Sequence, residues 1–166
     1  MLPRRLAPAE IDVLRPVFGG SLRYRLVRLT LDGPLAAGST KVVGNTIHFL
    51  SRQMVPAILV HEAVHVWQWQ LTGWYYAWQS LRDQFAAWRR CGSRGGAYDW
   101  TAPARAGRPW GGLRSEPQAQ LIEDAWRAGL VHDRRARLIA DGRDFTDYAR
   151  AALAELAAGG GAPRGA

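Results

Sequence analysis

Two histidines and a glutamate stand close together in the apolar stretch 58–70, and their spacing is typical of a metal site. His61 and His65 are four residues apart, so on a helix both imidazoles lie on one face and can bind a single ion. Glu62 lies one position further round, where its carboxylate can reach a metal-bound water and act as a general base. The pattern is HExxH, and it predicts a Zn²⁺ cofactor and hydrolysis of peptide bonds.

A competing interpretation is that these three residues are polar members of a core helix. In that case His61 and His65 form hydrogen bonds inside the core, and Glu62 pairs with an arginine. The neighbours are nearly all apolar, so three unpaired polar groups in this stretch would together cost several kcal/mol. A bound metal removes that cost, and we therefore favour the zinc site.

A catalytic zinc needs a third protein ligand and one open position. We expect the ligand to come from the segment 115–129, because Glu116 and Glu123 share one face of a helix there while the apolar residues share the other. Asp124 is a third acidic candidate, and His132 is a possible ligand further downstream. The spacing alone leaves these alternatives open.

Three more side chains are candidates for contact with a substrate. Tyr98 or His132 would stabilise the oxyanion that forms during hydrolysis. His48 lies in the segment 45–51, which alternates like a strand and precedes the metal helix, so it is either a cleft residue or a structural one. A sheet edge at this place would hold an extended peptide by strand addition.

The elements that must position these residues follow from periodicity and from Gly and Pro signals. Helices are expected at 7–19, 56–73, 74–90, 115–129, 132–142 and 144–156, strands at 22–31 and 45–51, and loops at 33–40 and 91–114. Aromatic residues recur at helical spacing within 74–90, which indicates packing, and the loop 91–114 is long enough to act as a lid. The helix at 115–129 is expected to begin with a capping box between Ser115 and Gln118.

Length and composition set the remaining expectations. The 166 residues fit one domain, expected at 1–158 and followed by a disordered tail at 159–166. A single cysteine, Cys91, excludes an internal disulfide and a cysteine-rich metal site. The net charge of +8 comes from scattered arginines, so nucleic acid is an unlikely partner, although a peptidase acting on DNA-bound protein is one alternative. No leader or membrane span is visible, and we expect a cytoplasmic protein unless a specialised machine exports it.

Several of these motifs together resemble one known group. The stretches APAEIDVLRPVFG, NTIHF, LVHEAVHVWQ and SEPQAQLIEDAW are similar to small bacterial zinc metallopeptidase-like proteins that occur as Vgr-related proteins and as core domains associated with contractile injection systems. The resemblance implies an α+β, mostly helical, minimal zincin-like domain of the gluzincin type, with a small sheet packed on the HExxH helix. It also implies that His61, His65 and Glu116 are the zinc ligands, with Glu123 the second choice for the third.

The same resemblance suggests partners. A peptide or protein would be the substrate, and a secretion or injection apparatus would be a possible partner. A non-catalytic, metal-stabilised module of such an apparatus is the alternative to an enzyme. The chain departs from the group's pattern at Pro117, where a glutamine is usual.

Overall fold

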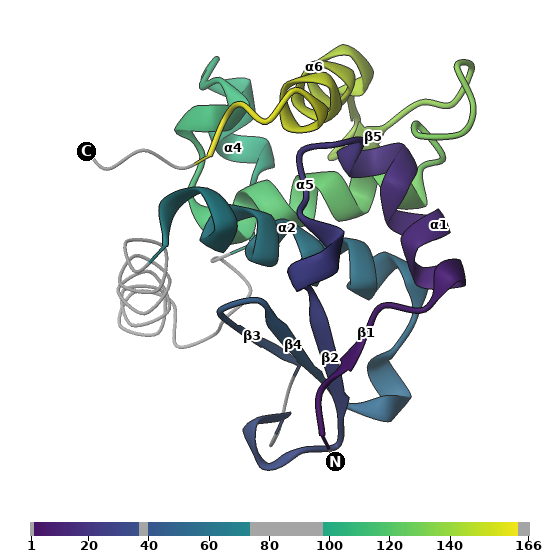
Figure 1. Ribbon diagram of the computed structural model, residues 1–166. Coiled ribbons are helices and arrows are strands. Elements are labelled where there is room, and N and C mark those ends of the chain that lie inside the picture. The colour runs from purple at the N-terminus through teal and green to yellow at the C-terminus, as the bar shows by residue number, and fades with distance from the viewer. Residues whose placement is uncertain (1, 37–39, 74–97, 163–166) are drawn as a thin grey trace.

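The computed structural model describes residues 2–36, 40–73 and 98–162, and these form an α+β fold with a small mixed sheet (Figure 1). The helices are α1 (Pro8–Phe18), α2 (Pro56–Thr72), α4 (Thr101–Arg105), α5 (Ser115–Arg127) and α6 (Thr146–Ala157). The strands are β1 (Arg4–Arg5), β2 (Arg28–Leu31), β3 (Lys41–Val43), β4 (Thr46–Phe49), β5 (Ile139–Ala140) and β6 (Arg143–Asp144). The expected α+β class is confirmed.

The four-stranded sheet has the order β1-β2-β4-β3, and α2 packs against its β3–β4 end. β2 and β4 are parallel, whereas β1 and β3 pair with them antiparallel. The other side of α2 meets α5, so α2 lies between the sheet and the helices above it (Figure 1). This arrangement places the helix that carries the two histidines in the middle of the fold.

Helix α2 begins and ends as its sequence predicts. Pro56 occupies the first turn, where its missing N–H would have no helical partner, and Gly73 ends the helix with a φ of 59°. Every residue from 59 to 68 is buried, so the helix has no solvent-facing side along its centre. The polar side chains of this stretch must therefore find partners inside the protein.

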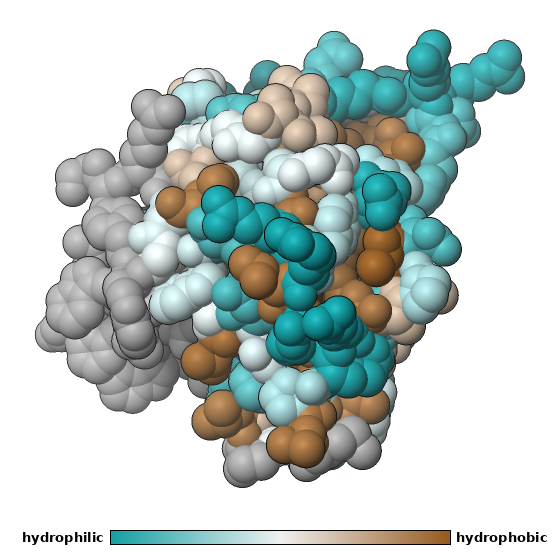
Figure 2. Space-filling view, viewed as in Figure 1, coloured by the Kyte–Doolittle hydropathy of each residue, from teal (hydrophilic) through white to brown (hydrophobic). Residues whose placement is uncertain are grey.

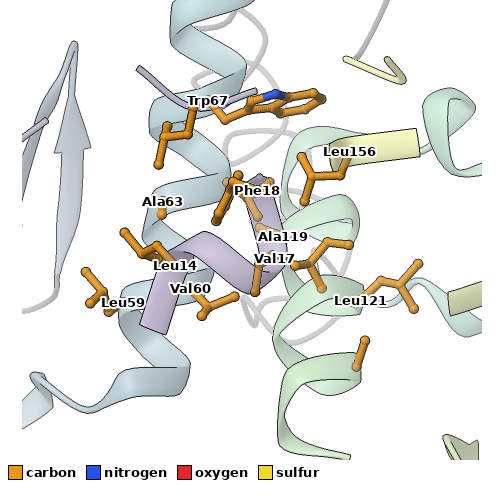
Figure 3. Packing of buried hydrophobic residues seen from close by; sticks show 14 of the residues in the cluster. Leu14, Val17, Phe18, Leu59, Val60, Ala63, Trp67, Ala119, Leu121 and Leu156 are labelled. Carbon is orange, nitrogen blue, oxygen red and sulfur yellow. The ribbon is translucent and has the colours of Figure 1, made fainter. Parts of the chain in front are cut away.

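The core joins α1, α2, α5 and α6 (Figure 3). Phe18 from α1, Trp67 from α2 and Leu156 from α6 are almost completely excluded from solvent. Burying side chains of this size stabilises the fold by about 1.5–3 kcal/mol each, which fixes α2 against its neighbours. On the face shown in Figure 2, hydrophilic and hydrophobic residues are interspersed, as expected for charges scattered along the chain.

Two of the predicted secondary-structure elements are wrong. The strand expected at 22–31 is limited to β2, because Tyr24–Leu26 form a 3₁₀ turn and the side chain of Gln70 on α2 accepts a hydrogen bond from the backbone N–H of Arg23. The helix expected at 132–142 is absent, and β5 and β6 form a hairpin instead. Asp141 and Gly142 both have positive φ at its turn, the Asp-Gly signature of a tight hairpin.

The expected helix starts at 7, 56, 115 and 144 agree with those of α1, α2, α5 and α6 to within two residues. The capping box at Ser115 does not form, since Ser115 is already helical and its hydroxyl makes no side-chain cap. The described part of the expected loop 91–114 contains α4 and a 3₁₀ turn, Trp110–Gly112. The aromatic helix predicted at 74–90, and the first part of that loop, lie outside the described residues.

No helix within the described ranges is long and apolar enough to cross a membrane.

Candidate metal centre

Helices α2 and α5 bring two imidazoles and one carboxylate to a common point. The Nε2 atoms of His61 and His65 lie 3.6 and 3.3 Å from Oε2 of Glu116. One donor atom from each of the three residues lies within 4.8 Å of the others, and all three side chains are buried. This group can hold a metal ion.

The donor set fits the preference of zinc. Zinc takes imidazole nitrogen and carboxylate oxygen at about 2.0–2.2 Å, which puts neighbouring ligand atoms of a tetrahedral site roughly 3.3 Å apart. The two distances to Glu116 Oε2 are close to that value. Magnesium and calcium prefer oxygen ligands throughout, so a site with two imidazoles favours a transition metal or zinc.

The opposite ring nitrogens are held by acceptors. His61 Nδ1 lies 3.0 Å from Glu123 Oε2, and His65 Nδ1 lies 2.9 Å from Gln68 Oε1. A carboxylate only accepts, so the Nδ1–H of His61 donates to Glu123. Each imidazole therefore carries a hydrogen on Nδ1 and directs Nε2 at Glu116, which is the arrangement that metal-binding histidines use.

The charge of the cluster matches a divalent cation. Glu62, Glu116 and Glu123 are buried carboxylates, and Arg127 pairs with Glu123 at 2.8 Å. Three carboxylates against one guanidinium leave two negative charges when both imidazoles are neutral. An uncompensated buried charge is costly, so this cluster favours either two extra protons or one dication.

In the absence of a metal, protons take this role. Burial disfavours a charged imidazole, but hydrogen bonds with Glu116 and Glu123 raise the pKa of His61 to about 10. Burial likewise opposes protonation of His65, and Glu116 outweighs it, so the pKa of His65 is also raised. Although burial opposes ionisation of Glu116, the neighbouring His65 and His61 hold the pKa of Glu116 well below its usual range. A metal would replace the protons between these residues.

Glu62 lies beside this group and has a different environment. It is 8% exposed, and burial raises the pKa of its carboxyl above the ordinary value while His65 and His61 act in the opposite direction. A carboxylate with a raised pKa is a better proton acceptor at neutral pH than an exposed one. This environment agrees with the proton-accepting role that the sequence predicts for Glu62.

The other acidic candidates have different roles. Glu123 contacts the far nitrogen of His61, so its carboxylate orients a histidine. Asp124 accepts a hydrogen bond from Trp100 Nε1 at 2.7 Å and another from Gln120 Nε2 at 2.9 Å. Glu116 is the acidic residue that lies with both histidines in the group whose ligand atoms are close enough to share one metal ion.

Of the remaining candidates, Tyr98 is the one that lies near the site. Its ring centroid is 6.1 Å from that of His61, and the residue is 37% exposed. His132 packs edge-on against Trp126, in the turn after α5 and therefore at the opposite end of that helix from Glu116. His48 Nδ1 lies 2.8 Å from Thr30 Oγ1 on the neighbouring strand, a contact that agrees with the structural one of its two expected roles.

The sequence reasoning missed the glutamines that support the site. Gln68 and Gln118 are completely buried and hydrogen-bonded to each other at 2.9 Å. Gln68 follows His65 by three residues, so it lies on the same helix face, and that spacing was the available signal.

No protein-family model, curated protein or solved structure matches this chain.

Proposed function

We propose that this protein is a zinc-dependent peptidase in which His61, His65 and Glu116 hold the metal and Glu62 is the general base. The observation that carries the proposal is the convergence of His61 Nε2, His65 Nε2 and Glu116 Oε2, with separations of 3.6 and 3.3 Å to the carboxylate oxygen. The small zincin-like group that the sequence resembles supports the same function.

When bound, zinc polarises a carbonyl and lowers the pKa of a bound water toward neutrality. Glu62 would accept a proton from the attacking water and later donate it to the leaving amine. Glu123 and Gln68 hold the two imidazoles in orientation throughout, since each accepts a hydrogen bond from an Nδ1–H. Tyr98 is the described residue near His61 with a hydroxyl group suited to stabilising an oxyanion.

Strand β3 supplies a place for the substrate. It is the last strand of the four-stranded sheet, and α2 packs beside it. An extended peptide can pair with such an edge through its backbone, which holds a peptide bond near the metal without selecting its side chains. The substrate class is accordingly a peptide or an extended segment of a protein.

The test compares wild type with Glu62→Gln. Both proteins are loaded with zinc and incubated with a synthetic peptide library of mixed sequence, and cleavage is followed by mass spectrometry. We expect the wild type to cleave and the Glu62→Gln variant to keep its zinc while losing about 10²- to 10⁴-fold in rate. Equal cleavage by the two proteins would contradict the role of Glu62.

The alternative is a non-catalytic module that zinc stabilises, and one observation favours it. His61, Glu62, His65 and Glu116 are each no more than 8% exposed, and closed sites are typical of structural zinc. In that case the wild type binds zinc tightly, cleaves none of the peptides, and unfolds at a lower temperature when the metal is removed.

A further inference from the structure

A line of buried amides connects the metal centre with the C-terminal segment 159–162. Gln68 accepts from His65 Nδ1 through Oε1 and donates through Nε2 to Gln118 Oε1 at 2.9 Å and to the Ser115 carbonyl at 3.2 Å. Gln118 Nε2 in turn donates to the Gly161 carbonyl at 2.7 Å and to the Trp110 carbonyl at 2.9 Å. The line thus runs from α2 through α5 to segment 159–162.

The direction of every bond in this line is fixed by its last members. Backbone carbonyls only accept, so the NH₂ group of Gln118 must face Gly161 and Trp110, and its oxygen must face Gln68. Gln68 must then present its own NH₂ group to Gln118 and its oxygen to His65. As a result, His65 carries its hydrogen on Nδ1, and the lone pair of Nε2 is directed at Glu116.

Segment 159–162, which the sequence predicts to be part of a disordered tail, instead packs closely against the fold. Gly161 has a φ of 80°, and a Cβ there would lie 2.5 Å from ring carbons of Trp110. Trp110 stacks on Trp67 of α2, with ring centroids 5.6 Å apart. Only glycine fits at this position, because both the backbone conformation and the contact with the indole exclude a side chain.

We infer that Gln68 and Gln118 are positioning residues for the metal centre and that docking of segment 159–162 strengthens metal binding. This inference rests on the proposed metal site. Two fully buried amides are expensive unless every group is paired, and an apolar pair would fill the same space. The hydrogen bonds of Gln68 and Gln118 run in one direction from His65 to segment 159–162. The two amides therefore orient His65 as well as filling the core.

The experiment measures the zinc dissociation constant by competition with a chromophoric chelator, in the full-length protein. Gln68→Met removes the acceptor of His65, Gln68→Glu retains it, and Gly161→Ala displaces the C-terminal segment. Gln70→Met is the control on the same helix, since Gln70 holds Arg23 and Asn45 and not the histidines. Gly142→Ala is the control for backbone strain, because Gly142 has a φ of 72° with open space around it.

We expect Gln68→Met to weaken zinc binding by about 10- to 100-fold and Gly161→Ala to weaken it by a smaller factor. Gln68→Glu should stay closer to wild type than Gln68→Met, and both controls should bind like wild type. Nitrogen-15 spectra of the zinc-loaded protein should show the Nδ1–H of His65 in wild type and in Gln68→Glu.

Two results would overturn the inference in different ways. A wild type that binds no zinc overturns the proposed function, and the inference with it. A wild type that binds zinc while Gly161→Ala and Gln68→Met bind equally tightly overturns the inference alone. If Gln68→Met fails to fold, Gly161→Ala decides, because its change lies in the terminal segment outside the helices.

Discussion

Two sets of carboxylates in this protein differ in burial and in their charged partners. At the surface, Glu10 pairs with Arg4 at 2.6 Å, and Asp144 pairs with Arg137, so each acid has its own arginine. Between α2 and α5, Glu62, Glu116 and Glu123 are buried, and Arg127 is the only arginine that an ion pair of the described residues brings to them. In the buried set, Glu116 and Glu123 contact histidines, which balance the negative charge only when they are protonated or bind a metal ion.

The difference separates stabilising charges from functional ones. Surface pairs are screened by water and contribute at most about 1 kcal/mol each. Buried carboxylates are costly, and a fold that needed only stability would replace them with apolar side chains. Of the three buried glutamates, Glu116 joins the two histidines in a group that could hold a metal ion, and Glu123 contacts one of those histidines.

The largest effect is expected at Glu116. Glu116→Ala removes the oxygen that lies 3.3 to 3.6 Å from both Nε2 atoms, so the protein should lose its zinc. We expect about one zinc per chain in wild type and near none in the variant, measured by mass spectrometry of metal content. Glu10→Ala is the matched control from the surface set and should retain zinc. Full zinc content in Glu116→Ala would remove this residue from the ligand set.

The second-largest effect is expected from removal of the metal, which should lower the free energy of unfolding. Zinc held between α2 and α5 would bind the folded state alone, so free zinc at about 100 times its dissociation constant should stabilise the fold by roughly 2.7 kcal/mol. The measurement is thermal unfolding of wild type with zinc and with a chelator. Loss of the stabilisation by zinc in the His65→Ala variant would support the site. If zinc stabilised His65→Ala as much as the wild type, the zinc would bind elsewhere.

A smaller effect is expected at Glu123, which orients His61 without belonging to the metal-sized group. Glu123→Gln keeps an acceptor for His61 Nδ1 but loses the charge, so zinc affinity should fall by about 10-fold. Competition with a chelator measures it, and Asp144→Asn, an exposed acid, serves as control. A complete loss of zinc in Glu123→Gln would mean that Glu123 is itself a ligand.

The smallest effect belongs to the surface pair. Burial opposes ionisation of Glu10, yet the Arg4 guanidinium and the Ala7 N–H together hold the pKa of Glu10 below its ordinary value. Its stabilisation is therefore present above pH of about 4.3 and is lost as the pH falls through the lowered pKa. Glu10→Gln should cost about 0.5 kcal/mol at pH 7 and nothing at pH 2. Chemical denaturation at both values tests this, and an equal cost at both would show that charge is not involved.

The sequence predicted those parts of the fold that local signals determine. Pro56 and Gly73 bound α2, and the spacing of His61 and His65 placed both imidazoles on one face. The stretch 22–31 was misread because Gln70, a distant residue, holds the backbone of Arg23 in a turn. An alternating pattern cannot reveal such a contact.

In the candidate site, too, local spacing predicted some residues, whereas others depend on tertiary packing. The residues on α2 were predictable because they lie on one helix, and the resemblance implied Glu116 as the third member of the group. The contact of Glu123 with His61 depends on how α5 packs against α2, and the contact of Gln118 depends on the position of Gly161. Those are tertiary relations, so the amide line to the C-terminal segment could not be predicted from spacing.

X-ray absorption spectroscopy of the zinc-loaded protein tests the central claim most directly. We predict nitrogen and oxygen neighbours at about 2.0–2.2 Å with the outer-shell scattering of two imidazoles in the wild type, and loss of the zinc in His61→Ala. Zinc that cannot be retained by the wild type, or a sulfur neighbour at about 2.3 Å from Cys91, would contradict a site made by α2 and α5.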